Sequence, residues 1–71
     1  MYKDAIMDEL RQIELDMVEG ERRLAEIEAR LVELKRLNED TTKVRAELDV
    51  MRKNQLDRDQ NRQRLLSLLH P

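Results

Sequence analysis

The sequence predicts an all-α fold, an antiparallel hairpin of two long amphipathic helices. Apolar side chains recur at alternating steps of three and four, the spacing of a helical seam. Charged residues make up 42% of the chain, which has only one Gly and one Pro, and this composition is typical of long helices. The apolar phase also slips once, at residues that suit a turn. We therefore expect one domain over residues 1–71.

The first helix is expected over about residues 4–37. Its seam consists of Ile6, Leu10, Ile13, Met17, Gly20, Leu24, Ile27, Leu31 and Leu34. A strand period of two fits none of this stretch. Asp4 suits the positive end of the helix dipole, and Lys35 and Arg36 suit the negative end.

The seam slips just beyond the first helix. From Leu31 two steps of three follow each other, and the alternation then resumes at Thr41. One continuous helix with a local overwinding would explain this slip, and so would a break. The chemistry of residues 38–42 favours the break, because Asn38 suits the left-handed end of a helix and Asp40 and Thr41 suit the start of the next.

The second helix is expected over about residues 42–69, stopped by Pro71. Folding back places Val44 near Leu34 and the C-terminal leucines near Leu10. The predicted core and oligomer interface consists of Leu10, Ile13, Met17, Leu24, Ile27, Leu31, Leu34, Val44, Leu48, Met51, Leu66 and Leu69. The leucines of residues 65–69 also fit the LxxLL pattern of groove-docking helices, or an apolar end on a membrane surface. Closure of the open end of the hairpin is favoured.

Pairing with a second copy is expected because two helices bury only one strip each. Val18, Ala25 and Val32 form a second row, seven residues apart, which widens the apolar face to the width typical of bundle helices. The chain has one aromatic residue to enlarge a core. A homodimeric four-helix bundle is favoured, while a trimer, a hetero-bundle or an engineered bundle would share the pattern.

The middle of the second helix is polar where the seam should be apolar. The basic residues of the segment 52–64 are Arg52, Lys53, Arg58, Arg62 and Arg64, against two acidic ones. One hypothesis is a nucleic-acid contact surface. The favoured one is a polar layer, in which Arg58 and Arg62 pair with Glu14, Asp16 or Glu21. Gly20 lies opposite this stretch, whose seam positions hold Gln55, Arg58 and Arg62. We expect Gly20 to make room for a long side chain such as Arg58 or Arg62, with a hinge or kink as the alternative.

No catalytic, metal or cofactor site is predicted. Cysteine is absent, His70 is the only histidine, and the Glu-x-x-His pattern of bundle metal sites is missing. No apolar run is long enough to span a bilayer. We expect a non-enzymatic cytoplasmic interaction protein that forms homo-oligomers and has no membrane contact. The alternative is a small nucleic-acid-binding regulator, which the net charge of −2 does not favour.

Two segments resemble a group of small α-proteobacterial proteins. The segments are Glu19-Gly20-Glu21-Arg22-Arg23-Leu24-Ala25-Glu26 and Asp40-Thr41-Thr42, followed by a leucine-bearing helix with Asp59-Gln60-Asn61-Arg62. The likeness covers about residues 17–69. Where that group tends to have Gly-His before its Asp-Thr turn, this chain has Asn38-Glu39. The resemblance implies a bacterial cytoplasmic helical hairpin and carries over no functional residue.

Overall fold

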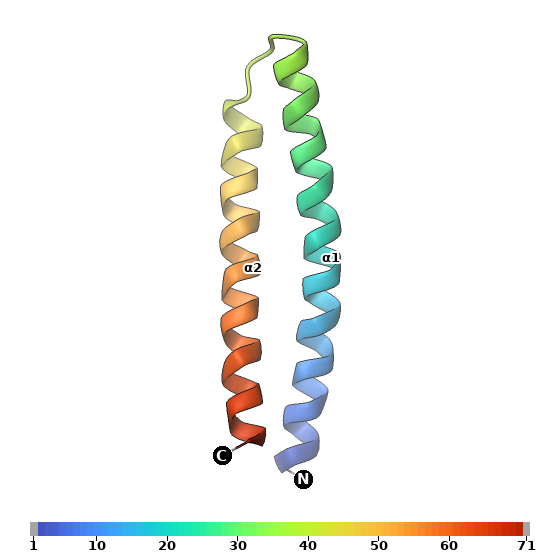
Figure 1. Cartoon of the computed structure of the whole chain (residues 1–71), viewed down its shortest axis with the longest axis vertical. Coiled ribbons are helices and arrows are strands. Elements are labelled where there is room, and N and C mark those ends of the chain that lie inside the picture. Colours follow the sequence, from blue (N-terminus) through green and yellow to red (C-terminus); the bar gives the residue numbers. More distant parts are fainter. Residues whose placement is uncertain (1, 71) are drawn as a thin grey trace.

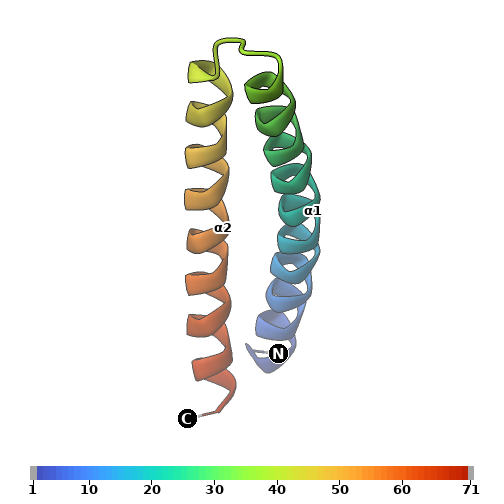
Figure 2. The ribbon, with the colours of Figure 1, turned by 45° about the horizontal axis from the view of Figure 1, so that its top comes forward.

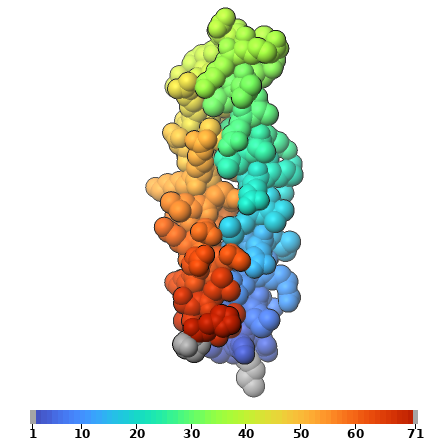
Figure 3. All heavy atoms as spheres, in the orientation of Figure 1, coloured from blue at the N-terminus to red at the C-terminus, as the bar shows by residue number. Residues whose placement is uncertain are grey.

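The computed structural model describes residues 2–70 and contains two helices joined by a short turn. α1 (Tyr2–Arg36) and α2 (Thr42–Leu69) lie side by side and antiparallel, so that the start of α1 and the end of α2 lie at the same end of the molecule (Figure 1). The molecule is slender, measuring 54 × 15 × 14 Å (Figure 3). The predicted hairpin is confirmed, and the alternative of one continuous helix is wrong.

The helix bounds lie close to those expected from the sequence. α1 begins two residues before Asp4, which lies in its first turn rather than at its boundary. A carboxylate there still meets the positive end of the helix dipole. At the other end the N–H of Leu37 donates to the carbonyl of Glu33 at 3.1 Å, so helical bonding reaches residue 37 although the helix ends at Arg36. Pro71, expected to stop the second helix, lies outside the described residues.

The turn begins with a left-handed residue, as predicted. Asn38 has φ of 56°. Its N–H donates to the carbonyl of Lys35 at 3.1 Å, and the N–H of Glu39 donates to that of Leu34 at 2.9 Å. This pair of bonds is the Schellman motif, which satisfies carbonyls that the helix end would otherwise leave without donors. Asn38 therefore ends α1 through its backbone conformation.

The start of α2 is capped by one of the two residues expected there. Oδ1 of Asp40 accepts from the N–H of Thr42 at 3.0 Å and from its hydroxyl at 2.7 Å. The bond from the Thr42 hydroxyl, and to a smaller extent the bond from its N–H, lower the pKa of Asp40 below its ordinary value of 3.8. The side chain of Thr41 makes no capping bond. The expectation of a cap is thus correct for Asp40 and wrong for Thr41, whose backbone, with φ of −107° and ψ of 2°, is not in the extended conformation typical of a capping residue.

The buried side chains gather at the two ends of the hairpin. Val44 and Leu48 are buried near the turn. At the open end a cluster joins the two helices, formed by Ile6, Leu10 and Leu65 with Ile13, Leu66 and Leu69 packed against it. Between these ends α1 continues unbroken through Gly20 and bows gently (Figure 2). No break in the helix is present at Gly20, and the alternative of a hinge there stays a prediction.

Candidate functional site

The twelve predicted core and interface residues are all at least partly buried in the single chain. Leu10, Val44 and Leu48 are buried, and the other nine are half-buried in the single chain. Ile6 and Leu65 are also buried, at 5% and 3% exposure, although the predicted set omits both. Each stands at a seam position. Ile6 belongs to the predicted seam, and Leu65 is one of the leucines expected to close the open end of the hairpin, where the structure places it.

The middle of the hairpin holds a polar layer, built around Gly20. A Cβ added at Gly20 would lie 2.6 Å from Cδ of Gln55 and 2.8 Å from Nη1 of Arg58, so both side chains use the space that glycine leaves. Nε2 of Gln55 donates to the carbonyl of Met17 at 3.0 Å, and Nη1 of Arg58 donates to Oε1 of Gln55 at 2.8 Å. The prediction that a long side chain of α2 uses the space beside Gly20 is confirmed for Arg58, and the side chain of Gln55 lies closer still.

The predicted ion pairs of this layer form at one of two arginines. Nε of Arg62 lies 3.6 Å from Oε1 of Glu14 across the hairpin. Arg58 donates to the Gln55 amide instead of a carboxylate, so the prediction for Arg58 is wrong. The reason is local, because Gln55 stands one turn before Arg58 on the same helix and its oxygen is already held beside Gly20.

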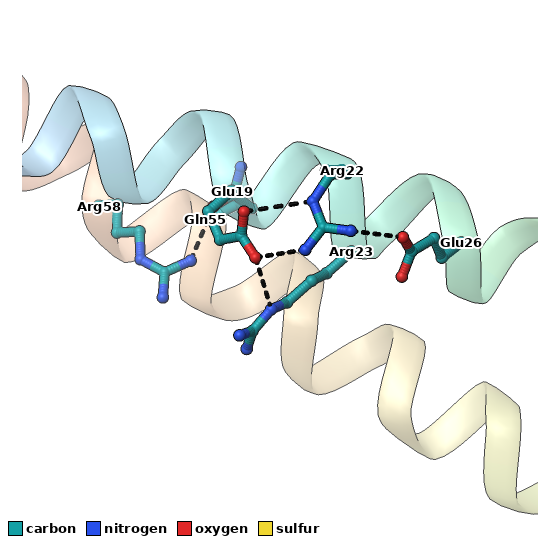
Figure 4. A network of polar contacts seen from close by, with 6 residues as sticks. All are labelled: Glu19, Arg22, Arg23, Glu26, Gln55 and Arg58. Carbon is teal, nitrogen blue, oxygen red and sulfur yellow. Dashed lines mark hydrogen bonds and ion pairs between the residues drawn. The ribbon is translucent and has the colours of Figure 1, made fainter.

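A network of charged side chains flanks the polar layer on α1 (Figure 4). Glu19 accepts from Arg22 and Arg23, and Arg22 also donates to Glu26. The Arg22 hydrogen bond is the main reason that the pKa of Glu19 is lowered, and Glu19 in turn raises that of Arg22. These groups are exposed, so their pairing within one helix contributes little to stability. Their role is that of a solvated surface.

The five basic residues of segment 52–64 divide among different surroundings. Arg58 and Arg62 are half-buried between the helices. Nη2 of Arg52 lies 3.7 Å from Oε1 of Glu28 on α1. Lys53 and Arg64 are exposed. Nucleic-acid binding needs basic groups gathered on one surface. Here two of the five residues lie in the helix contact, one forms an ion pair with α1 and two are exposed on α2, so the five do not form one basic surface.

The most unusual surface feature is the exposed apolar row. Val18 and Val32 are 67% and 65% exposed, and Ala25 between them is exposed as well. Each follows a half-buried seam residue by one position, so the three lie on one flank of the helix contact. Leu56 stands in the same relation to Gln55 on α2 and is 56% exposed. We call this flank the row face.

The opposite flank carries a second apolar patch. Ile27, Ala46, Val50 and Met51 line a shallow groove of about 430 Å³, whose rim is charged by Lys43 and Glu47. Val50, 59% exposed, precedes seam residue Met51 by one position and so faces away from the row face. The hairpin therefore has two flanks of different character, a long row and a short groove.

Some site types are not found in residues 2–70. Neither helix is long and apolar enough to cross a membrane. No group of three or more His, Asp or Glu side chains in this part of the chain could hold a metal ion. The leucines of the open end are mainly used in the hairpin, since Leu65 is buried and Leu66 and Leu69 pack on its cluster.

Comparison with protein-family models, curated proteins and solved structures finds no match to this chain.

Proposed function

We propose that the chain is a non-enzymatic structural module that acts by self-association, two copies packing their row faces together as a four-helix bundle. The single observation that carries the proposal is the exposure of Val18 and Val32 in a regular row. Scattered surface valines are ordinary, but a row at heptad spacing is the pattern by which helices pack.

The exposed surface area supports the same conclusion. The single hairpin exposes 5688 Å². A compact monomer of this mass, 8.6 kDa, is expected to expose about 4,700 Å². The excess of about 1,000 Å² is similar to the area of about 800 Å² that each partner contributes to a standard interface. A second copy on one flank would cover an area of this size.

A substitution on each flank tests the proposal. We expect the unchanged chain to have the mass of two copies by light scattering, with a length close to the 54 Å of the hairpin by small-angle X-ray scattering. Val32→Lys should convert it to single chains at the same concentration, because a lysine in the apolar row would be buried in the contact without a partner.

Val50→Lys is the matched control, since Val50 has similar exposure on the opposite flank. It should leave the dimer intact. Loss of the dimer in Val50→Lys but not in Val32→Lys would move the contact to the groove flank. A well-folded single chain without any substitution would end the proposal.

Nucleic-acid binding is the second candidate, favoured by the basic character of α2, which has seven basic and four acidic side chains. Its test is binding of double- and single-stranded DNA and RNA at two salt concentrations. A complex driven by phosphate contacts weakens steeply as salt rises. Absence of binding at low salt would exclude this candidate.

A further inference from the structure

Two symmetric dimers can stack one row face on another, and they differ in which helices meet. If the two-fold axis runs parallel to the helices, α1 packs against α2 of the second copy and both turns lie at the same end. If the axis is perpendicular to the helices, α1 packs against α1 and the turns lie at opposite ends. Both arrangements keep neighbouring helices antiparallel, so helix dipoles do not decide between them.

The charges of the helices do decide between the two arrangements. α1 has ten acidic and seven basic side chains, a net charge of −3, while α2 with four and seven has +3. Packed helices lie about 8–10 Å apart, which is close to the screening length of about 8 Å in physiological salt. Contact between unlike helices is therefore attractive, and contact between like helices is repulsive.

The row face itself repeats this difference. Glu14, Glu21 and Glu28 each follow a seam residue of α1 by one position and stand between the apolar members of the row, while Arg11 and Lys35 hold the corresponding positions towards the two ends of the helix. A perpendicular axis would set this acidic row against its own copy. The corresponding positions of α2 include Arg45 and Arg52 with Asp49 and Asp59, so that face has no net charge. The acidic row of α1 is therefore repelled less by α2 of the second copy than by α1 of the second copy.

The apolar side chains also fit a parallel axis. Because Gln55 bonds to the carbonyl of Met17, Leu56 stands close to the level of Val18 along the hairpin. A two-fold axis parallel to the helices keeps every residue at its own level. It would therefore bring the exposed Leu56 of one copy to the exposed Val18 of the other.

We propose that two copies pair about a two-fold axis parallel to their helices, so that α1 of each packs against α2 of the other and the two turns lie together. This inference rests on the proposed self-association. It adds the orientation of the partner, which sets where the ends of each chain emerge.

Distances between spin labels in the dimer test the orientation. The chain has no cysteine, so Glu39→Cys gives one thiol per copy at the exposed turn. Pulsed electron paramagnetic resonance should give a short separation, about 10–14 Å between the backbones plus the reach of the two labels, because the residues lie between one interhelical distance and the bundle diagonal apart. Labels on turns at opposite ends would be separated by nearly the 54 Å length of the hairpin. Lys43→Cys, exposed at the same end, repeats the measurement if the Glu39 variant loses helicity.

Asp57→Cys is the control, because residue 57 lies near the middle of α2 and gives a short distance in either arrangement. Short distances at both the middle and the turn support the proposal. A short distance at the middle with a long one at the turn overturns the orientation and leaves self-association standing. Light scattering that shows single chains overturns both.

Discussion

The ends of the hairpin and its middle use the same seam in different ways. At the ends the seam is aliphatic, with Leu65 and Leu48 among its most buried residues. In the middle it holds Gly20 beside two polar side chains, where Arg58 donates to Gln55 and Gln55 donates to the backbone carbonyl of Met17. Apolar burial is non-directional, whereas a hydrogen bond requires one geometry. We infer that the ends supply most of the stability and the middle fixes the alignment of the helices.

The largest expected effect is at the open end. Leu65→Ala should lower the free energy of unfolding by about 2–5 kcal/mol, because it removes buried methyl groups and leaves a cavity in the cluster. Urea denaturation followed by circular dichroism measures the change. Leu68→Ala is the matched control, since Leu68 is 44% exposed, and it should change stability far less. Equal effects of the two substitutions would contradict the division between ends and middle.

A smaller effect is expected in the polar layer. Gln55→Ala should cost about 1 kcal/mol, the usual net value of a hydrogen bond, because the bond to the carbonyl of Met17 is lost. Gln60→Ala, exposed on the same helix, should have little effect. If the Gln55 variant is as destabilised as Leu65→Ala, the polar middle is the main source of stability.

The coupling free energy between substitutions at Gly20 and Gln55 should be smaller than either of these effects on stability. Gly20→Ala adds helix propensity of up to about 1 kcal/mol, but its Cβ would displace the Gln55 side chain. In the Gln55→Ala background this obstacle is reduced, so Gly20→Ala should stabilise the protein more there than in the unchanged chain. The double-mutant cycle measures the difference. Additive effects would show that Gln55 does not depend on the space at Gly20.

The smallest effect is expected at the turn, where Asp40 is exposed and outside the seam. The pKa of Asp40 is lowered from 3.8 in the folded chain by its bonds to Thr42. The stabilisation is therefore present above the ordinary pKa and is lost as the pH falls through the lowered value. Asp40→Asn should be less stable than the unchanged chain at neutral pH, with the difference vanishing in acid. A difference that persists in acid would exclude the carboxylate as its cause.

The sequence predicted the path of the chain better than the partners of its polar side chains. The phase slip and Asn38 located the turn because backbone conformation there depends on local residue type. The spacing of the seam placed Leu10, Val44 and Leu48 between the helices. The period also put Gln55 and Arg58 at seam positions, but it could not say which fills the space beside Gly20. Long polar side chains choose among several rotamers and acceptors, and that choice depends on neighbours from the other helix.

Both ends of the described chain lie at the open end of the hairpin, away from the turn (Figure 1). A force pulling residues 2 and 70 apart would therefore act across the helices and peel them from one another, a few contacts at a time. The Ile6–Leu10–Leu65 cluster would bear that load first. Once it ruptured, the polar middle would offer less resistance than the cluster. The protein should accordingly yield at a force set by its terminal leucines and isoleucines, with the turn the last part to open.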